Sequence, residues 1–257
     1  MTDSSELLIE KREGVDWVTL NRPQRRNALN GGLLDALHSY FECVRRDEAV
    51  RVIVLRGSGT GFCSGVDAKD YTDPETPPME TWKLGDCVRL IHEGPQPVIA
   101  LINGPAMGAG FALAAAADVR IAAASAWMQA NFTHLGLGGA ELGLSYFLPP
   151  SLGHSVAREL VMTARRFPAD RALATGFVSE VVPDEALDQA GTHMAAEMMA
   201  LTPIGLRTTK QTMNAATLGN LEAAIEFERR GQLLCAQGTL ATRFGELADQ
   251  LSNRTKK

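Results

Sequence analysis

The sequence predicts an α/β fold that ends in a helical region. Residues 52–70 and 98–118 each have the pattern of a buried strand, a glycine-rich loop and the start of a helix. Beyond Asp184 the pattern is almost entirely helical. We therefore expect residues 1–183 to form an α/β core and residues 184–257 to form a C-terminal helical region.

The composition is that of an ordinary globular protein. The chain has 257 residues, of which 45% are hydrophobic, so it can bury a sizeable core. Its 25 Lys and Arg residues are outnumbered by 30 Asp and Glu residues, which argues against nucleic acid or an anionic membrane as a partner. The four cysteines show no C-x-x-C pairing, and the N-terminus shows no targeting signal. We expect a cytoplasmic protein.

The first half of the core follows from local patterns. Two apolar runs flank Glu13-Gly14 and predict an opening β-hairpin. Apolar residues at three- and four-residue spacing after Asn30 predict a helix, and residues 50–55 predict a strand. Residues 71–79 hold three prolines among acidic residues, which predicts a flexible loop. A helix over about residues 80–91 should follow.

The second half alternates similarly. We expect a strand at 119–123, an ambiguous segment at 127–132, a third glycine-rich loop at 136–143, helices at about 154–163 and from Pro168, and a short strand at 178–182. Pro149-Pro150 and Gly153 should bracket the start of the first of these helices.

The central stretch, residues 98–117, carries no charged residue and is long enough to span a membrane. That interpretation fails because Asn103-Gly104-Pro105 interrupts it after five β-compatible residues, and two further glycines precede an alanine-rich helix that begins at Phe111. Such a loop leaves the first N–H groups of the helix without partners, and its small residues let an outside group approach them. The pattern indicates an oxyanion or phosphate cradle.

Motif chemistry favours the oxyanion. The sequence has no G-x-x-x-x-G-K-[ST] motif, and Gly104, Gly108 and Gly110 do not have G-x-G-x-x-G spacing. From this loop alone, close packing of a helix on a strand is an equally good interpretation. The similar glycine loop at residues 57–65 favours a site that binds an acyl oxygen.

Four motifs, taken in order, resemble those of one known family. They are NRP and RNALN at 21–30, FCSGVDAK at 62–69, NGPAMGAG at 103–110, and ALATGFVSEVV at 172–182. Together they resemble the enoyl-CoA hydratase/isomerase, or crotonase, superfamily over nearly the whole chain. The resemblance implies a ββα superhelix with a C-terminal helical trimerisation region. It also implies a coenzyme A thioester as substrate, with no metal or other cofactor.

The resemblance also implies site residues. In this family two backbone N–H groups hold the thioester oxygen, and by position these belong to Val66 and Ala109. Residues implied in substrate or CoA binding are Arg26, Ala28, Ser64, Gly65, Val66, Asp67, Ala68, Gly108 and Ala109. For Asp67, a helix cap is an alternative role.

The chain departs from the family pattern where hydratases carry two glutamates, because Ala112 and Phe132 occupy those positions. Neither side chain moves a proton, so the usual hydratase pair is missing. Glu141 lies in a run that is similar to that of peroxisomal-type Δ3,Δ2-enoyl-CoA isomerases, and the similarity implies a single catalytic glutamate. The structural alternative is a solvated surface carboxylate.

The residues around Glu141 suggest a water-poor pocket. The side chains expected to line it are Phe132, Leu135, Leu137, Leu142 and Phe147, and we expect His134 to serve as a packing or hydrogen-bonding residue. Asp118 should be a structural partner for nearby N–H groups.

Two kinds of function stay open. One is an enoyl-CoA isomerase in which Glu141 carries a proton from C2 to C4 while Val66 and Ala109 hold the enolate; weak hydration or another enolate reaction is a narrower enzymatic alternative. The other is an acyl-CoA-binding protein with little turnover.

We also expect a homotrimer or a dimer of trimers, because the helical tail carries surplus apolar residues, namely Ile204, Leu206, Leu218, Leu221 and Ile225.

Overall fold

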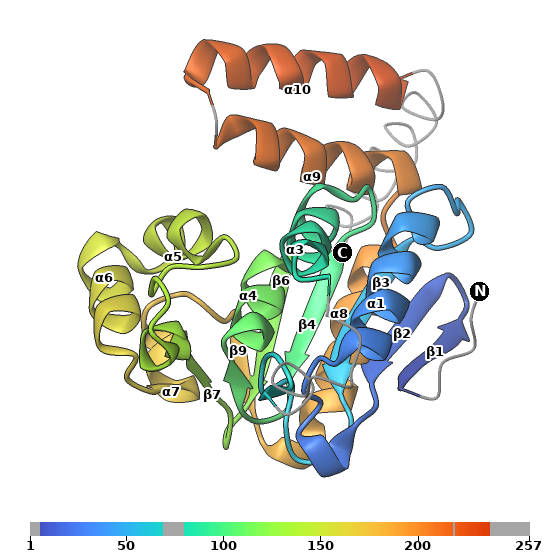
Figure 1. Ribbon diagram of the computed structural model, residues 1–257. Helices are drawn as coiled ribbons and strands as arrows, with labels where there is room; N and C mark the ends of the chain where they lie inside the picture. The colour runs from blue at the N-terminus through green and yellow to red at the C-terminus, as the bar shows by residue number, and fades with distance from the viewer. Residues whose placement is uncertain (1–5, 69–79, 218, 237–257) are drawn as a thin grey trace, which may run out of the picture. The chain divides into compact units, whose positions relative to one another are not determined.

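The computed structural model describes residues 6–68, 80–217 and 219–236 (Figure 1). The chain divides into two compact units between Ala200 and Leu201. The second unit contains helices α9 (Pro203–Ala216) and α10 (Leu221–Ala236), which pack against each other. The division lies beyond the predicted one at residue 183, because helix α8 (Leu187–Met199) packs on the sheet of the first unit.

Six strands form the main sheet, in the order β1-β2-β3-β4-β6-β9. They are β1 (Leu7–Arg12), β2 (Val15–Leu20), β3 (Val52–Gly57), β4 (Val98–Ile102), β6 (Val119–Ala123) and β9 (Glu180–Val182). The first pair is the predicted hairpin and is antiparallel, whereas the other pairs are parallel. Every residue of β2 and β4 is buried, as expected of parallel strands covered on both faces.

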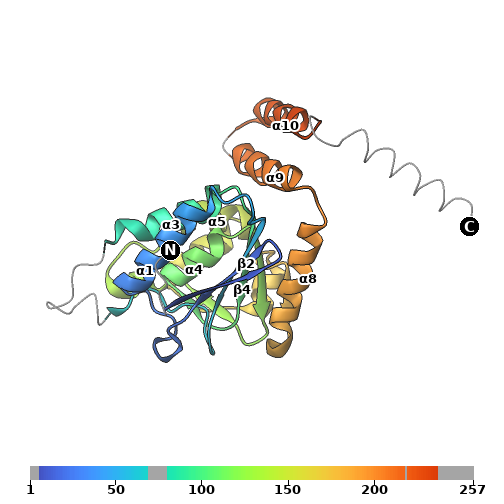
Figure 2. The same cartoon turned by 90° about the vertical axis from the view of Figure 1, so that its right-hand side faces the viewer.

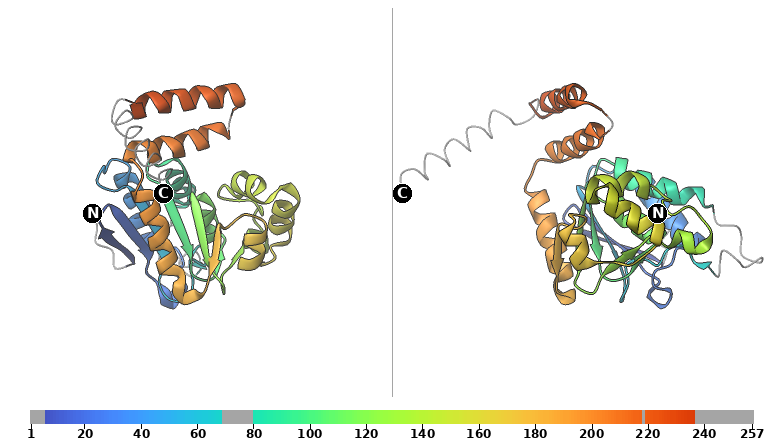
Figure 3. Two further views of the ribbon diagram at one scale, coloured as in Figure 1. Left: turned by 180° about the vertical axis from the view of Figure 1, so that it is seen from behind. Right: turned by 90° about the vertical axis from the view of Figure 1, so that its left-hand side faces the viewer.

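Helices cover both faces of this sheet. Helices α1 (Gly31–Val44), α3 (Trp82–Glu93) and α4 (Ala109–Ala116) lie together on one face, and α8 lies on the other (Figure 2, Figure 3). The approach of α8 is close, since a Cβ placed on Gly191 would lie 2.6 Å from Leu101 Cδ1 in β4. A larger residue at 191 would push α8 away from the sheet.

The predicted first helix is confirmed with its cap. The Asn30 side chain accepts a hydrogen bond from the Leu33 N–H (2.8 Å), which satisfies one of the free donors at the start of α1. The apolar face that the spacing predicted is buried against the sheet. Its members are Leu33, Leu34, Ala36, Leu37, Tyr40, Phe41 and Val44.

A smaller sheet and three helices complete the first unit. The sheet consists of β5 (Ala106–Met107), β7 (Trp127–Gln129) and β8 (Phe167–Pro168). A 3₁₀ helix, Asn131–Leu135, follows β7, so the ambiguous segment at 127–132 is part strand and part helix. The three helices are α5 (Leu144–Leu152), α6 (His154–Thr163) and α7 (Ala169–Ala174).

Helix α5 was not predicted, because Pro149 and Pro150 were expected to precede a helix and instead lie inside one. Each proline removes a backbone donor, which normally ends a helix. Here Leu144, Leu148 and Leu152 recur at four-residue spacing and are all buried. Burial of this stripe outweighs the local penalty, since most helical stability in proteins comes from packing.

The central stretch forms strand β4, a loop and helix α4, as predicted, although the helix begins at Ala109 and not at Phe111. Asp118 is the predicted structural partner, since its carboxylate accepts a hydrogen bond from the Val98 N–H (2.7 Å). No helix in the described part of the chain is long and apolar enough to cross a membrane. The predicted flexible loop at 71–79 lies outside the described residues.

Candidate active site

The two predicted glycine loops lie against each other. The N–H groups of Phe62 and Cys63 donate to the Pro105 carbonyl (3.1 and 3.2 Å), and the Met107 N–H donates to the Cys63 carbonyl (2.8 Å). Cys63 and Ala106 therefore form a short parallel bridge. Because the two loops follow neighbouring parallel strands, the sheet brings their ends to the same edge.

Two buried or half-buried asparagine side chains hold the first loop in shape. Asn27 donates to the carbonyls of Ser58 (2.9 Å) and Gly61 (2.8 Å), and Asn103 donates to those of Gly59 (3.0 Å) and Gly61 (3.2 Å). Asn27 has a positive φ of 55°, which asparagine tolerates better than most residues. Both asparagines lie in the family-like motifs, but the sequence did not reveal that they support the loop.

Asp67 is held in a buried ion pair with Arg22. The Arg22 Nη1 lies 3.0 Å from Asp67 Oδ2 and 2.5 Å from the Ala28 carbonyl oxygen, and both charged side chains are less than a tenth exposed. Such a pair ties the far end of the first loop to the segment before α1. The structure thus gives Asp67 a supporting role, and its predicted contact with CoA stays a prediction.

The Val66 N–H points away from the chain that supports it. Leu29 bridges to Val66, with the Leu29 N–H donating to the Gly65 carbonyl (2.8 Å) and the Asp67 N–H donating to the Leu29 carbonyl (2.9 Å). In a parallel bridge this pattern uses the groups on either side of the bridged residue. The Val66 N–H therefore donates a hydrogen bond to no group within the described residues.

The Ala109 N–H is also without an acceptor among the described residues. Ala109 is the first residue of α4, whose first backbone bond runs from the Ala112 N–H to the Gly108 carbonyl (3.1 Å). A Cβ placed on Gly65 would lie 3.5 Å from the Ala109 nitrogen. The two free donors therefore belong to touching segments, one of them at a helix N-terminus that favours negative charge.

Gly110 allows this contact between the loops, because a Cβ at that position would lie 2.1 Å from the Cys63 carbonyl oxygen. We expect Gly110→Ala to lower the free energy of unfolding by about 1–3 kcal/mol, the usual cost of overpacking. The matched control is Gly85→Ala in α3, where a Cβ would meet nothing within 4 Å. The control should stabilise by about 0.4–1 kcal/mol. Urea unfolding measures both, and equal effects would contradict the role given to Gly110.

The remaining predicted binding residues lie around the first loop. The Ser64 N–H donates to the Arg26 carbonyl (3.0 Å), so these two residues are neighbours. Arg26 is exposed, as is Ala68, whereas Ala28 is buried. Arg26 has a positive φ of 51°, and its predicted contact with the substrate stays a prediction.

No proton-moving group occupies the two positions where hydratases carry glutamate. Ala112 is fully buried in α4, one turn after Ala109. The Phe132 ring lies close to Gly108, since a Cβ at Gly108 would be 3.7 Å from Phe132 Cε1 and 2.9 Å from Asn131 Oδ1. Gly108, the residue before Ala109, therefore lies beside the apolar Phe132 ring and the Asn131 amide, which the sequence did not single out.

Cys63 is a nucleophilic residue type in the first glycine loop, and its burial makes its thiol unreactive. Its side chain is fully buried, and this burial raises the pKa of the thiol to about 12. The thiol therefore stays protonated at neutral pH and is a poor nucleophile. Covalent catalysis through Cys63 does not fit this site.

Glu141 lies at the surface of the third glycine loop. Its carboxylate turns back over that loop, because a Cβ at Gly138 would lie 3.0 Å from Glu141 Oε1. Within the described residues it makes no hydrogen bond or ion pair. The loop itself is anchored on α6, since a Cβ at Gly139 would be 2.1 Å from the Val161 carbonyl oxygen.

The predicted apolar pocket around Glu141 forms only in part. Phe132 is buried and Phe147 is half-buried, but Leu135 is 69% exposed and Leu137 is 55% exposed. His134, expected to pack or to form hydrogen bonds, is exposed and has no partner among the described residues. The two leucines and the histidine come after Phe132, the one buried residue of the short 3₁₀ helix. The described part of the first unit does not cover them.

The sequence of the chain matches a known protein family. Residues 10–237 match the model of the enoyl-CoA hydratase/isomerase family. A probable enoyl-CoA hydratase of Mycobacterium tuberculosis is 38% identical over 242 residues, covering 90% of this chain and 85% of the relative. The 1,2-epoxyphenylacetyl-CoA isomerase of Escherichia coli is 32% identical over 237 residues, covering 90% of each.

Solved structures lead to the same family. The crystal structure of a monofunctional enoyl CoA isomerase from M. smegmatis superposes with a TM-score of 0.75 at 36% identity, covering 86% of this chain and 99% of that one. The predicted α/β fold with a helical C-terminal region and the predicted resemblance are both confirmed. The chain belongs to the enoyl-CoA hydratase/isomerase family and has the crotonase fold.

Proposed function

We propose that this member of an acyl-CoA enzyme family is a Δ3,Δ2-enoyl-CoA isomerase. The observation that carries the proposal is the pair of unused N–H groups, on Val66 and Ala109, beside two positions from which both family carboxylates are missing. Removing a proton from C2 of a thioester places negative charge on its oxygen, and two preorganised donors stabilise that charge.

The proton transfer is assigned to Glu141. Its carboxylate takes the proton from C2, the double bond shifts as charge moves onto the thioester oxygen, and the same carboxyl returns the proton at C4. Hydration instead needs groups that hold and activate a water molecule, and Ala112 and Phe132 hold none. The solved monofunctional enoyl CoA isomerase of M. smegmatis supports this choice, whereas the Mycobacterium tuberculosis relative is named as a probable hydratase.

One observation favours the second candidate, an acyl-CoA-binding protein with little turnover. Glu141 is exposed and folds back over Gly138. As an isomerase, the protein must turn this carboxylate toward the substrate when the thioester binds, whereas a pure binding protein leaves it at the surface.

The deciding experiment compares a 3-enoyl-CoA with a 2-enoyl-CoA in steady-state assays. We expect isomerisation of the 3-enoyl-CoA to be far faster than hydration of the 2-enoyl-CoA. Phe132→Glu, which restores one hydratase carboxylate beside Gly108, should raise hydration relative to isomerisation. Faster hydration than isomerisation by the wild type would refute the proposal, and tight binding of both thioesters without turnover would favour the binding protein.

We predict that catalysis needs no metal or nicotinamide, because the sequence has neither fingerprint. In calorimetry, acyl-CoA should bind with the same affinity before and after dialysis against a chelator, and NAD should produce no heat. Tight NAD binding together with no affinity for CoA thioesters would contradict the prediction.

The four cysteines are free thiols, which fits the predicted cytoplasmic location.

We also propose assembly into a homotrimer or a dimer of trimers. Within the second unit, Ile204, Leu221 and Ile225 are exposed, Leu206 is half-buried, and Leu218 lies outside the described residues. Exposed apolar side chains gathered on one helical hairpin are typical of an interface. Light scattering at micromolar concentration should give three or six times the chain mass of 27.6 kDa. A monomer would contradict the proposal.

A further inference from the structure

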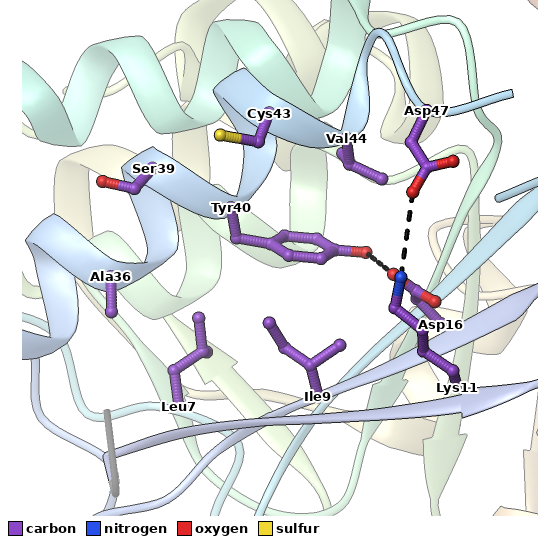
Figure 4. A pocket seen from close by; sticks show the side chains of 10 residues that line it. All are labelled: Leu7, Ile9, Lys11, Asp16, Ala36, Ser39, Tyr40, Cys43, Val44 and Asp47. Atoms are coloured by element: carbon purple, nitrogen blue, oxygen red, sulfur yellow. Dashed lines mark hydrogen bonds and ion pairs between the residues drawn. The ribbon is translucent and has the colours of Figure 1, made fainter. Parts of the chain in front are cut away.

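A cavity of about 70 Å³ lies between edge strand β1 and helix α1, away from the glycine loops (Figure 4). Its apolar end is formed by Leu7, Ile9 and Ala36. Its opposite end carries Asp16, Tyr40, Lys11 and Asp47. The cavity therefore joins a short hydrocarbon surface to a cluster of charged and polar groups.

Asp16 is the buried charge of this cavity. Only 3% of the residue is exposed, and its Oδ2 accepts a hydrogen bond from the Tyr40 hydroxyl (3.0 Å). Its other oxygen, Oδ1, has no partner among the described residues, yet it is not sealed from the cavity. Burial raises the pKa of the Asp16 carboxyl, and the Tyr40 hydrogen bond opposes that rise. The Tyr40 hydrogen bond and the Lys11 charge thus compensate the buried carboxylate only in part.

The nearby charges leave a net negative cavity. Lys11 stands opposite Asp16 in the β1–β2 register but lies 3.8 Å from Asp47, with which it forms a long ion pair. Two carboxylates therefore face one ammonium group, and burial raises the pKa of the Tyr40 hydroxyl above its ordinary value, so it is neutral at pH 7. A single added positive charge would balance the cavity.

We propose that this cavity binds a primary alkylammonium group, with its nitrogen donating to Asp16 Oδ1 and its carbon chain packed on Leu7, Ile9 and Ala36. The volume equals roughly two water molecules at about 30 Å³ each, which suits an ammonium group with its first carbons. Four members of the lining are exposed, namely Ile9, Lys11, Ser39 and Cys43, so the cavity reaches the surface beside β1 and α1 and a longer chain has room to extend outward.

The experiment uses n-propylammonium chloride and the full-length protein, with the methyl groups of Leu7, Ile9 and Val44 as NMR reporters. We expect saturable millimolar binding that shifts these three signals together. The matched neutral probe is n-propanol, which has the same hydrocarbon chain and should bind at least tenfold more weakly. Sodium chloride at equal concentration controls for ionic strength.

Three variants test the assignment. Asp16→Asn should weaken propylammonium binding at least tenfold; it keeps an acceptor for the Tyr40 hydroxyl and removes the buried charge, so the fold should be at least as stable. Ser39→Leu should fill the opening and abolish binding, whereas Ser39→Ala should leave it unchanged. Because the cation binds the ionised carboxylate, affinity should fall as the pH is lowered into the range in which Asp16 protonates.

Two results would overturn the proposal. One is equal binding of propylammonium and propanol, or unchanged affinity in Asp16→Asn, because either would show that the Asp16 carboxylate does not recognise the cation. The other is a linear, non-saturating shift that sodium chloride reproduces.

Discussion

Replacing Glu141 by Gln is expected to lower the isomerisation rate by about 10²–10⁴, the usual contribution of a positioned acid–base group, while acyl-CoA affinity changes little. Glutamine keeps the size and most of the polarity of the side chain but does not accept a proton. If Glu141 carries the proton between C2 and C4, no other carboxylate replaces it, because the two family positions hold Ala112 and Phe132.

The control for this variant is Glu48→Gln, which makes the same change at another exposed carboxylate without a partner among the described residues. It should leave activity unchanged. Steady-state isomerisation and calorimetric binding of a saturated acyl-CoA measure the two effects separately. Isomerisation that survives loss of Glu141 would show that another residue moves the proton. Absence of turnover in the wild type, with intact binding, would identify a binding protein.

Ala109→Pro is expected to lower kcat/KM by about 10²–10³ or more, because it removes one of the two proposed oxyanion donors. The backbone should tolerate the change. Ala109 is the first residue of α4, a position that proline favours, and Gly108 before it has φ 51° and ψ −117°, outside the α region that a following proline excludes. The proline ring also occupies the space next to the donor, so thioester binding should weaken as well.

His154→Pro provides the matched control. It introduces proline at the first position of α6, where His154 is exposed and Gly153 before it has φ 77° and ψ 151°, outside the α region that a following proline excludes. The position is far along the chain from Val66 and from Ala109. Its activity should equal that of the wild type. Binding of free CoA, which lacks the thioester, should persist in Ala109→Pro. Unchanged kcat/KM in Ala109→Pro would remove Ala109 from the oxyanion site.

The strands and helices with the clearest periodicity could be predicted from the sequence. The apolar runs of β3 and β4 and the three- and four-residue spacing of α1 are local patterns, and each produced the predicted element. The glycine loops were equally predictable, because an apolar run that breaks into glycines and small residues is typical of a buried strand ending in a tight turn. The motifs that these loops carry also placed the chain in its family.

What the sequence left open were contacts between distant positions. Helix α5 forms despite two prolines because burial of Leu144, Leu148 and Leu152 outweighs local propensity, and burial depends on the whole fold. The exposure of Leu135 and Leu137 has the same origin: an apolar side chain is buried only if another part of the chain covers it.

The same distinction between local pattern and distant contact applies to the candidate site. Its residue types were evident from the sequence: two glycine loops, small residues at a helix start, and one remaining glutamate. Only the tertiary structure showed that Gly65 lies against the Ala109 nitrogen and that Arg22, Asn27 and Asn103 hold the first loop in place. The physical reason is that these hydrogen-bond partners lie 34 to 45 positions apart and are chosen by the strand order of the sheet, whereas the sequence pattern determines which segments become strands, loops and helices.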